Sequence, residues 1–260
     1  MTYQFLQLEK QKAAGILRFN RPERLNAFEA SMVQEIPAAL RELLDDDGVR
    51  VVILTGNGKG FCAGADVNYL SALAAAKDVA RGKALVSTGN EIIEMIHAAE
   101  KPVIAAINGP AAGGGASIAL ACDIRLMAQS ATLGFTFIRI GLHPDLGATY
   151  FLPRLVGPAK AAELLMLGDM ISAEEALRLN LVNHVVVDSD LFPAALQLAE
   201  TLAEKSPLAL RLLKKGLQQS YGQSLDAMLK YEVYAQGLCF ESKEAAAAIQ
   251  NFLAARKIKI

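Results

Sequence analysis

Short apolar runs alternate with amphipathic helical patterns in the first half of the chain, and this alternation limits the possible folds more than any other feature. Apolar, β-forming runs separated by helix-period stretches are typical of parallel strands with helices packed outside them. The sequence therefore predicts an α/β core up to about residue 135. The expected strands are residues 5–8, 15–19, 51–54, 103–107 and 124–127, and the expected helices are residues 29–44, 82–98 and 116–121.

Helical patterns dominate the chain after residue 145. Ser206-Pro207 has the form of a helix start, and Ser172 followed by Glu175 has capping-box spacing. Alanine-rich amphipathic helices at this end either pack between subunits or cover the chain's own core. The predicted division is residues 1–195 for the core and 196–260 for the helical region. The expected helices are residues 145–155, 159–167, 173–179, 190–205, 207–221, 225–239 and 243–255.

Composition excludes several classes of protein. The 260 residues are 53% apolar and 20% charged, which fits neither a disordered chain nor a fibre. A formal charge of -1 gives no basic surface, so nucleic acid is not an expected partner. No apolar run reaches the length of a spanning helix and residues 1–10 do not resemble a secretory signal, so we expect a cytoplasmic protein without a membrane partner.

The cysteines point to no disulfide or metal site. Cys62, Cys122 and Cys239 are odd in number, widely spaced and without a CxxC motif or a histidine-rich neighbour. We expect them to stay reduced.

Two glycine-rich segments follow apolar strands. VVILTGNGKGFCAGAD (51–66) is not a dinucleotide fingerprint, because Phe61 and Ala63 stand where a third glycine would be needed. KPVIAAINGPAAGGGASIALACD (101–123) runs from a strand through three glycines into a helix of small residues. Such a turn either exposes backbone N–H groups to an oxygen that becomes negative, or lets the helix and strand pack closely.

Asp145 is the single acidic residue in IGLHPDLGATYFLPRLVG (140–157). A structural reading makes it the N-cap of the helix that follows, since His-Pro-Asp before an apolar run is typical of a helix start. A functional reading makes it a carboxylate held in an apolar pocket.

Five segments together resemble the enoyl-CoA hydratase/isomerase (crotonase) superfamily over nearly the whole chain. The resemblance implies a crotonase-like spiral of repeated ββα units with a helical C-terminal region, and trimers that can pair into hexamers. It also implies an acyl-CoA thioester substrate and no cofactor, since coenzyme A is part of the substrate and no metal is used. The segments are RPERLNAF (21–28), KGFCAGADV (59–67), KPVIAAINGPAAGGGASIALACDIRLM (101–127), IGLHPDLGATYFLPRLVG (140–157) and LLMLGDMISAEEALRLNLVNHVV (164–186).

The resemblance also implies roles for individual residues. The backbone N–H groups of Ala65 and Gly114 would form an oxyanion hole for the thioester oxygen. Arg24 matches a position where the family tends to place a basic residue near the phosphates of coenzyme A. The full set expected to bind substrate is Arg24, Ala27, Ala63, Ala65, Asp66, Val67, Gly113, Phe137 and Leu142.

The chain departs from the hydratase pattern at two positions. Hydratases of this type place two glutamates around a water molecule, and here those positions hold Ser117 and Phe137. Asp145 instead matches the single aspartate of enoyl-CoA isomerases, including ring-oxepin isomerases. A dehalogenase branch also has this aspartate, but with a histidine and a tryptophan where this chain has Asn90 and Phe137.

A single carboxylate is sufficient for an isomerase. One base can remove a proton from C2 of a 3-enoyl thioester and return it to C4 on the same face, giving the conjugated 2-enoyl form. Apolar neighbours would raise the pKa of Asp145 towards neutrality, and the residues expected around it are Phe135, Phe137, Ile138, Leu142 and Leu146. His143, two residues away, is an alternative base.

The sequence thus favours an isomerase that shifts a Δ3 double bond to Δ2, with Asp145, Ala65 and Gly114 as catalytic groups. Two alternatives remain. One is a hydratase in which Asp145 acts with an unrecognised partner. The other is a non-catalytic acyl-CoA-binding or RNA-binding member of the superfamily, which a basic surface formed by Arg211, Lys214 and Lys215 would favour.

Overall fold

A six-stranded sheet forms the centre of the fold in the computed structural model, which describes residues 2–257, with side chains up to residue 254. In spatial order its strands are β1 (Leu6–Gln11), β2 (Ala14–Phe19), β3 (Val51–Gly56), β4 (Val103–Ile107), β6 (Ile124–Ala128) and β9 (His184–Val186). The parallel pairing predicted from the sequence is confirmed from β2 to β9, whereas β1 and β2 form an antiparallel hairpin. Ile53 and Ile104 are fully buried, as expected for strands covered on both faces.

A second, three-stranded sheet lies beyond the carboxyl ends of β4 and β6, and the sequence did not predict it. Its strands are β5 (Ala111–Ala112), β7 (Thr132–Gly134) and β8 (Met170–Ser172), with β7 between the other two. Strands of two or three residues are too short to show a period of two. This sheet carries the backbone that leads into the triple glycine.

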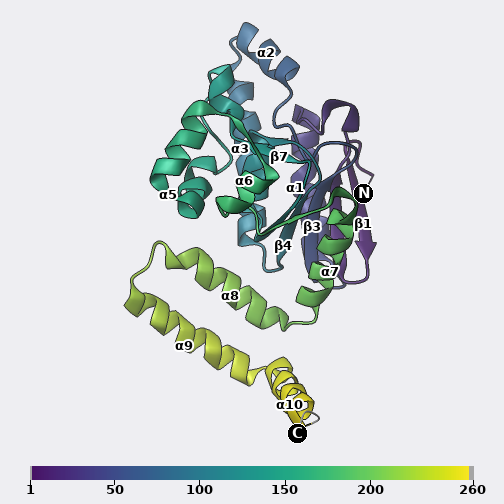
Figure 1. Cartoon of the computed structure of the whole chain (residues 1–260), viewed down its shortest axis with the longest axis vertical. Helices are drawn as coiled ribbons and strands as arrows, with labels where there is room; N and C mark the ends of the chain where they lie inside the picture. Colours follow the sequence, from purple (N-terminus) through teal and green to yellow (C-terminus); the bar gives the residue numbers. More distant parts are fainter. Residues whose placement is uncertain (1, 258–260) are drawn as a thin grey trace.

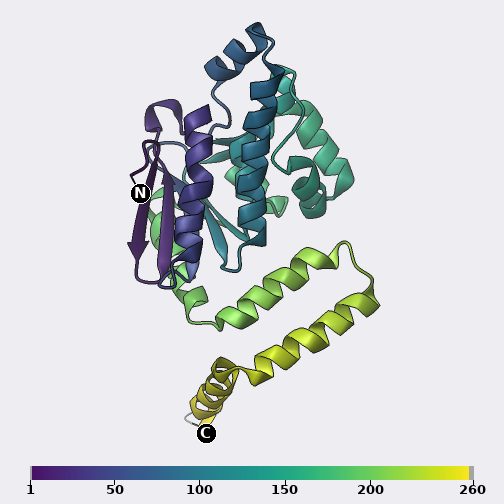
Figure 2. The ribbon, with the colours of Figure 1, turned by 180° about the vertical axis from the view of Figure 1, so that it is seen from behind.

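Helices cover both faces of the main sheet. The helix α7 packs on β2, β3, β4 and β6 on one face (Figure 1), while α1 lies on the other face with α3 beside it (Figure 2). Ser172 caps α6 through a hydrogen bond from the Glu175 N–H, as the sequence predicted. The helices of this part are α1 (Ala30–Asp45), α2 (Val67–Ala75), α3 (Val79–Ala98), α4 (Gly114–Ala121), α5 (Ala148–Leu167), α6 (Ala173–Arg178) and α7 (Leu191–Ala203), with short 3₁₀ helices η1 (Pro22–Arg24), η2 (Thr136–Ile140) and η3 (Asp188–Asp190).

Three helices continue the chain beyond the core: α8 (Pro207–Ser220), α9 (Leu225–Glu241) and α10 (Lys243–Lys257). Figures 1 and 2 show α9 and α10 standing away from the sheet, on the far side of α8. The boundary expected at residue 195 falls inside α7, which packs on the sheet, so the separate helical region begins with Pro207. Within residues 2–257, no helix has both the length and the apolar character needed to cross a bilayer.

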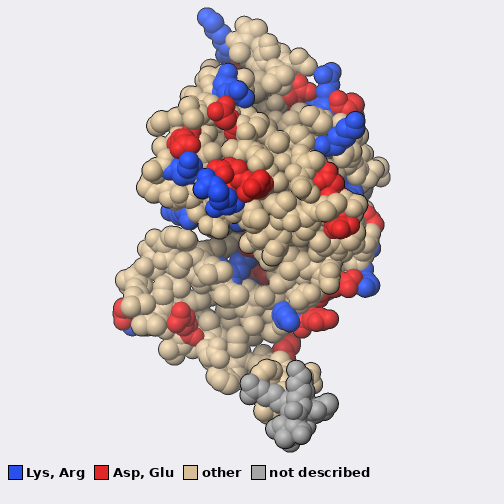
Figure 3. All heavy atoms as spheres, viewed as in Figure 1, with Lys and Arg blue, Asp and Glu red and all other residues tan. Residues whose placement is uncertain are grey.

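The helical region exposes apolar rather than basic side chains. Leu217, Leu225 and Val233 are 62%, 75% and 76% exposed, and Figure 3 shows few charged side chains over α8 and α9 on the face in view. The basic surface considered in the sequence does not form. Lys214 is buried and pairs with Asp123 at 2.8 Å, and Arg211 pairs with Glu100. The structure therefore gives no support to the RNA-binding alternative.

Candidate active site

The loops that follow β3 and β4 pack backbone against backbone. Cys62 and Ala111 form a parallel bridge, and the Ala112 N–H donates to the Cys62 carbonyl at 2.9 Å. Glycine is required at this contact, because a Cβ on Gly115 would collide with the carbonyl oxygen of Cys62. Gly64 has a φ of +82°, and a Cβ there would lie 2.7 Å from the Ala112 oxygen. Close packing, one of the two interpretations of the triple glycine, is therefore present in the structure.

Two backbone N–H groups at this contact are left without a protein acceptor. The Gly113 N–H donates to Gly134 and the Asp66 N–H donates to Phe28. The adjacent N–H groups, those of Ala65 and Gly114, donate to no protein group within residues 2–257. Gly114 is the first residue of α4, so its N–H lies at the positive end of that helix. This pair of amides can hold an oxygen that becomes negative.

Ser117 and Phe137, the two positions that the resemblance equates with the hydratase glutamates, offer no acid or base. Ser117 is fully buried on α4, and its hydroxyl donates to the Asp145 carbonyl at 3.1 Å or to the Gly113 carbonyl at 3.3 Å. Phe137 on η2 is 7% exposed, and its ring lies near Gly113. Ser117 therefore holds backbone carbonyl groups in place, and Phe137 supplies an apolar surface.

Asp145 lies in the loop between η2 and α5 and does not cap the helix. The N-cap interpretation is wrong because α5 begins only at Ala148, and its N-cap is Gly147 without a side-chain hydrogen bond. Leu146 and Gly147 both have positive φ, at 51° and 77°, which delays the helix by three residues relative to the prediction. The carboxylate is therefore not used in helix capping.

Burial raises the pKa of Asp145 to about 6, while the nearby His143 and the residue's own backbone N–H act in the opposite direction. The surroundings differ in part from the expected pocket. Phe135, Phe137 and Leu146 are buried, but Ile138 and Leu142 are 47% and 43% exposed. A carboxyl group with this pKa is mostly ionised at neutral pH and still basic enough to accept a proton.

The Leu146 side chain links the Asp145 loop to Gly114 at the start of α4. Its side chain is 7% exposed, and its Cδ2 would lie 3.4 Å from a Cβ on Gly114. The Ser117 hydroxyl reaches the same loop from the next turn of α4. The loop that carries Asp145 therefore packs against the first turn of α4 through Leu146 and Ser117.

The other predicted binding residues surround the same two loops. Arg24 is exposed on η1, and no carboxylate within residues 2–257 pairs with it. Ala27 is buried, Ala63 is partly exposed, and Val67 is 62% exposed at the start of α2. Their contacts with coenzyme A remain predictions.

Asp66 and Arg21 form an ion pair that sequence reasoning missed. The Arg21 Nη1 lies 2.8 Å from Asp66 Oδ2, and Arg21 also donates to the Ala27 carbonyl. Burial alone would raise the pKa of Asp66, but hydrogen bonds from Arg21 and Asn68 and the charge of Arg21 hold it below its usual value. The carboxylate also caps α2. Asp66 therefore fixes the loop that carries Ala65, and the only sequence signal was an acidic residue just before a helix.

The family model for enoyl-CoA hydratase/isomerase matches residues 9–260. The chain belongs to this family. It is 38% identical to a crotonyl-CoA hydratase of Syntrophomonas wolfei, over 99% of this chain and 98% of that protein. It is 36% identical to a 1,2-epoxyphenylacetyl-CoA isomerase of Escherichia coli, over 97% of both chains. The crystal structure of an enoyl-CoA hydratase from Bacillus anthracis superimposes with a TM-score of 0.92 at 34% identity, over 97% of both chains. The predicted α/β crotonase fold is thereby confirmed.

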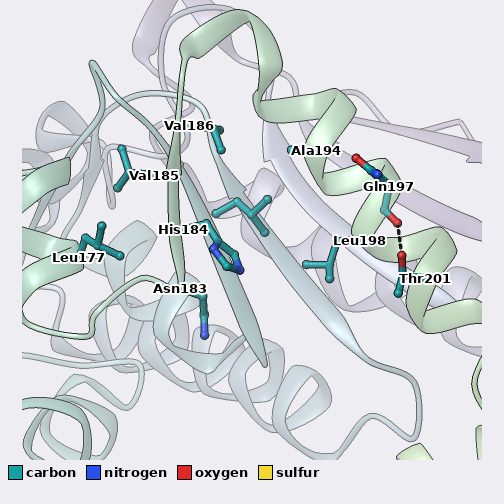
Figure 4. Close-up of a pocket in the computed structure, with 10 residues that line it drawn as sticks. Leu177, Asn183, His184, Val185, Val186, Ala194, Gln197, Leu198 and Thr201 are labelled. Atoms are coloured by element: carbon teal, nitrogen blue, oxygen red, sulfur yellow. Dashed lines mark hydrogen bonds between the residues drawn. The ribbon is translucent and has the colours of Figure 1, made fainter.

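Two grooves of the chain lie away from the two loops. One of about 470 Å³ opens between β9 and α7 (Figure 4), where the Asn183 side chain accepts a hydrogen bond from the Arg125 N–H. A second of about 320 Å³ lies between α1, α2 and α3. We place the site by its chemistry, because neither groove is lined by Ala65, Gly114 or Asp145. The first is lined by Leu126, Leu177, Asn183, His184, Val185, Val186, Ala194, Gln197, Leu198 and Thr201.

Two of the cysteines lie in the core. Cys62 and Cys122 are buried, which raises the pKa of each thiol to about 12. Within residues 2–257, no three His, Cys, Asp or Glu side chains gather as a metal ion would require.

Proposed function

We propose that this chain isomerises 3-enoyl-CoA thioesters to 2-enoyl-CoA thioesters, with Asp145 as the only acid/base. The observation that carries the proposal is a carboxylate whose pKa is raised to about 6, in a loop whose Leu146 side chain packs against Gly114 and its unpaired N–H. Ser117 and Phe137 stand in place of the hydratase glutamates. The raised pKa is the property that a base working at neutral pH needs.

The reaction balances with these groups alone. The Asp145 carboxylate removes a C2 proton, and the electron pair spreads over C2, C4 and the thioester oxygen. The N–H groups of Ala65 and Gly114 hold that oxygen while it is negative, which contributes several kcal/mol to a reaction of this kind. The protonated Asp145 then returns the proton to C4. Water takes no part, so an apolar wall at Phe137 is compatible with the reaction.

Hydration is the second candidate, and the name of the Syntrophomonas relative favours it. Addition of water needs a base for the water and an acid for the α-carbon. Asp145 could serve as one of these. The Ser117 hydroxyl already donates to a backbone carbonyl and Phe137 has no proton to give, so the second group would have to come from elsewhere, with His143 the nearest candidate.

The rest of the proposal concerns binding and assembly. Arg24 would contact the phosphates of coenzyme A, and residues 63–67 would line its adenine and pantetheine parts. The exposed apolar side chains of α8 and α9 support assembly as a trimer or a pair of trimers. Light scattering tests the assembly, and a monomer would contradict it.

The test of function uses 3-enoyl and 2-enoyl thioesters of matched length, with products separated by mass. A 3-enoyl substrate that carries deuterium at C2 is expected to give product with deuterium at C4, because one carboxyl group moves the same hydron. A hydratase would instead add one water to the 2-enoyl thioester. Faster hydration than isomerisation would contradict the proposal.

A further inference from the structure

Leu146 adopts a backbone conformation that leucine rarely takes, and its side chain is held from two sides. Its φ is +51°, directly after Asp145 and before Gly147 at +77°. A non-glycine residue stays in this region only where its surroundings fix it. The side chain enters a slot between Gly89 of α3 and Gly114 of α4.

Gly89 makes this slot possible. A Cβ on Gly89 would lie 2.9 Å from Leu146 Cδ1, 3.0 Å from Cγ and 3.2 Å from Cδ2. These distances are shorter than ordinary contacts between carbon atoms. Glycine is otherwise unfavourable in the middle of a helix such as α3, and Gly89 has no positive φ to require it. Space for Leu146 is therefore the reason for glycine here.

The geometry points to Gly89 as a positioning residue for the reaction, acting through Leu146 on Asp145. The slot fixes Leu146 against α4, whose first residue supplies the Gly114 N–H, so the base and the oxyanion donor keep one relative position. This inference rests on the proposed role of Asp145 as the base. Gly89 itself touches neither substrate nor reacting atoms.

A purely structural role for Gly89 predicts a different result. If the glycine only let α3 pack closely, an added methyl group would weaken the fold and leave the chemistry of the folded protein unchanged. Gly82 is a matched control on the same helix, since a Cβ there would meet nothing within 4 Å. Both changes replace glycine by a better helix former within α3.

The experiment compares Gly89→Ala with Gly82→Ala in kcat, KM and melting temperature. Gly89→Ala is expected to lower kcat about tenfold with KM nearly unchanged, because a misplacement of about 1 Å can cost roughly 10²-fold and a Cβ on Gly89 overlaps Leu146 by only part of that distance. The melting temperature of this variant should stay close to that of the parent. Gly82→Ala should keep the normal kcat. Leu146→Met added to Gly89→Ala should restore part of the rate, since the unbranched side chain can bend away from the new methyl group.

The outcomes separate this inference from the proposed function. If Asp145→Asn is inactive but Gly89→Ala keeps a normal kcat, the positioning role is wrong and the base remains. An equal loss of kcat in the Gly82→Ala control would also refute the role of Gly89. If Asp145→Asn retains activity, the proposed base is wrong whatever Gly89→Ala does. Leu146→Ala empties the slot between Gly89 and Gly114. This variant must also lower kcat more than it changes KM.

Discussion

The helices α4, which begins at the proposed oxyanion donor Gly114, and α9 differ completely in how far their side chains are buried. All 8 residues of α4 are buried, whereas none of α9 is. The proposed site is therefore built inside the core by close backbone contacts, while the helical region carries exposed apolar surface. Changes in the core should act on the rate, and changes in the helical region should act on stability and assembly.

Asp145→Asn should give the largest effect on the core side of this comparison. The amide cannot accept the C2 proton, so kcat should fall by roughly 10²- to 10⁴-fold. Burial makes the carboxyl group hold its proton more tightly in the folded protein than in the unfolded chain. Stability is therefore lost as pH rises from about 4 to 6, and the asparagine variant, which avoids this loss, should melt no lower than the parent at pH 7.

Asp226→Asn is the matched control, because this carboxylate lies exposed on α9 in an ion pair with Lys230. Its kcat should be normal. Calorimetric melting and steady-state rates measure both variants, and a normal rate for Asp145→Asn would exclude it as the base.

Lys214→Met should break the attachment of the helical region without touching the chemistry. The Lys214 ammonium lies 2.8 Å from Asp123 and donates to the carbonyls of Ile96 and Lys101. Loss of these bonds leaves a partly buried carboxylate, so the free energy of unfolding should fall by about 2 kcal/mol. Urea unfolding measures it, with the exposed Lys215→Met as control. A fall in kcat of the folded protein, without a change in stability, would contradict the separation of the two regions.

The pH profile should report the burial of Asp145. The base works only when ionised, so kcat should rise about tenfold per pH unit below an apparent pKa of about 6 and then level off. The rate is followed from pH 4.5 to pH 8, a range chosen around that value. A midpoint near the ordinary value of roughly 4 would show that substrate binding does not keep Asp145 in an apolar setting.

Prediction from the sequence succeeded where proline, glycine or asparagine marks the end of an element. The strand at residues 103–107 was predicted with its observed bounds, because an apolar run is enclosed between Pro102 and Asn108-Gly109. The break predicted between residues 155 and 159 is also present, since Gly157 interrupts α5 with a non-helical φ of 77°.

Prediction from the sequence failed where contacts between distant parts of the chain determine the local structure. The helix after Asp145 was placed three residues early because two positive φ values, set by the Leu146 slot, are invisible in a propensity pattern. The helix α2 was not predicted, and none of its residues is buried in the core. The pairing of Arg21 with Asp66 spans 45 positions of the chain and has no local signal.

Ser117→Ala should give the smallest effect and the finest test of how the core holds its base. The hydroxyl donates to the Asp145 or Gly113 carbonyl, and a neutral hydrogen bond of this kind contributes about 1 kcal/mol. If that energy fixes the Asp145 loop, kcat should fall about fivefold, with KM and the apparent pKa nearly unchanged. Thr201→Ala removes a similar hydroxyl bond, to the Gln197 carbonyl on α7, and should leave kcat normal. Equal rates for Ser117→Ala and the parent would show that the Leu146 slot alone holds the loop. Alanine is favourable in a helix, so a large fall in melting temperature would instead assign the hydroxyl to the stability of α4.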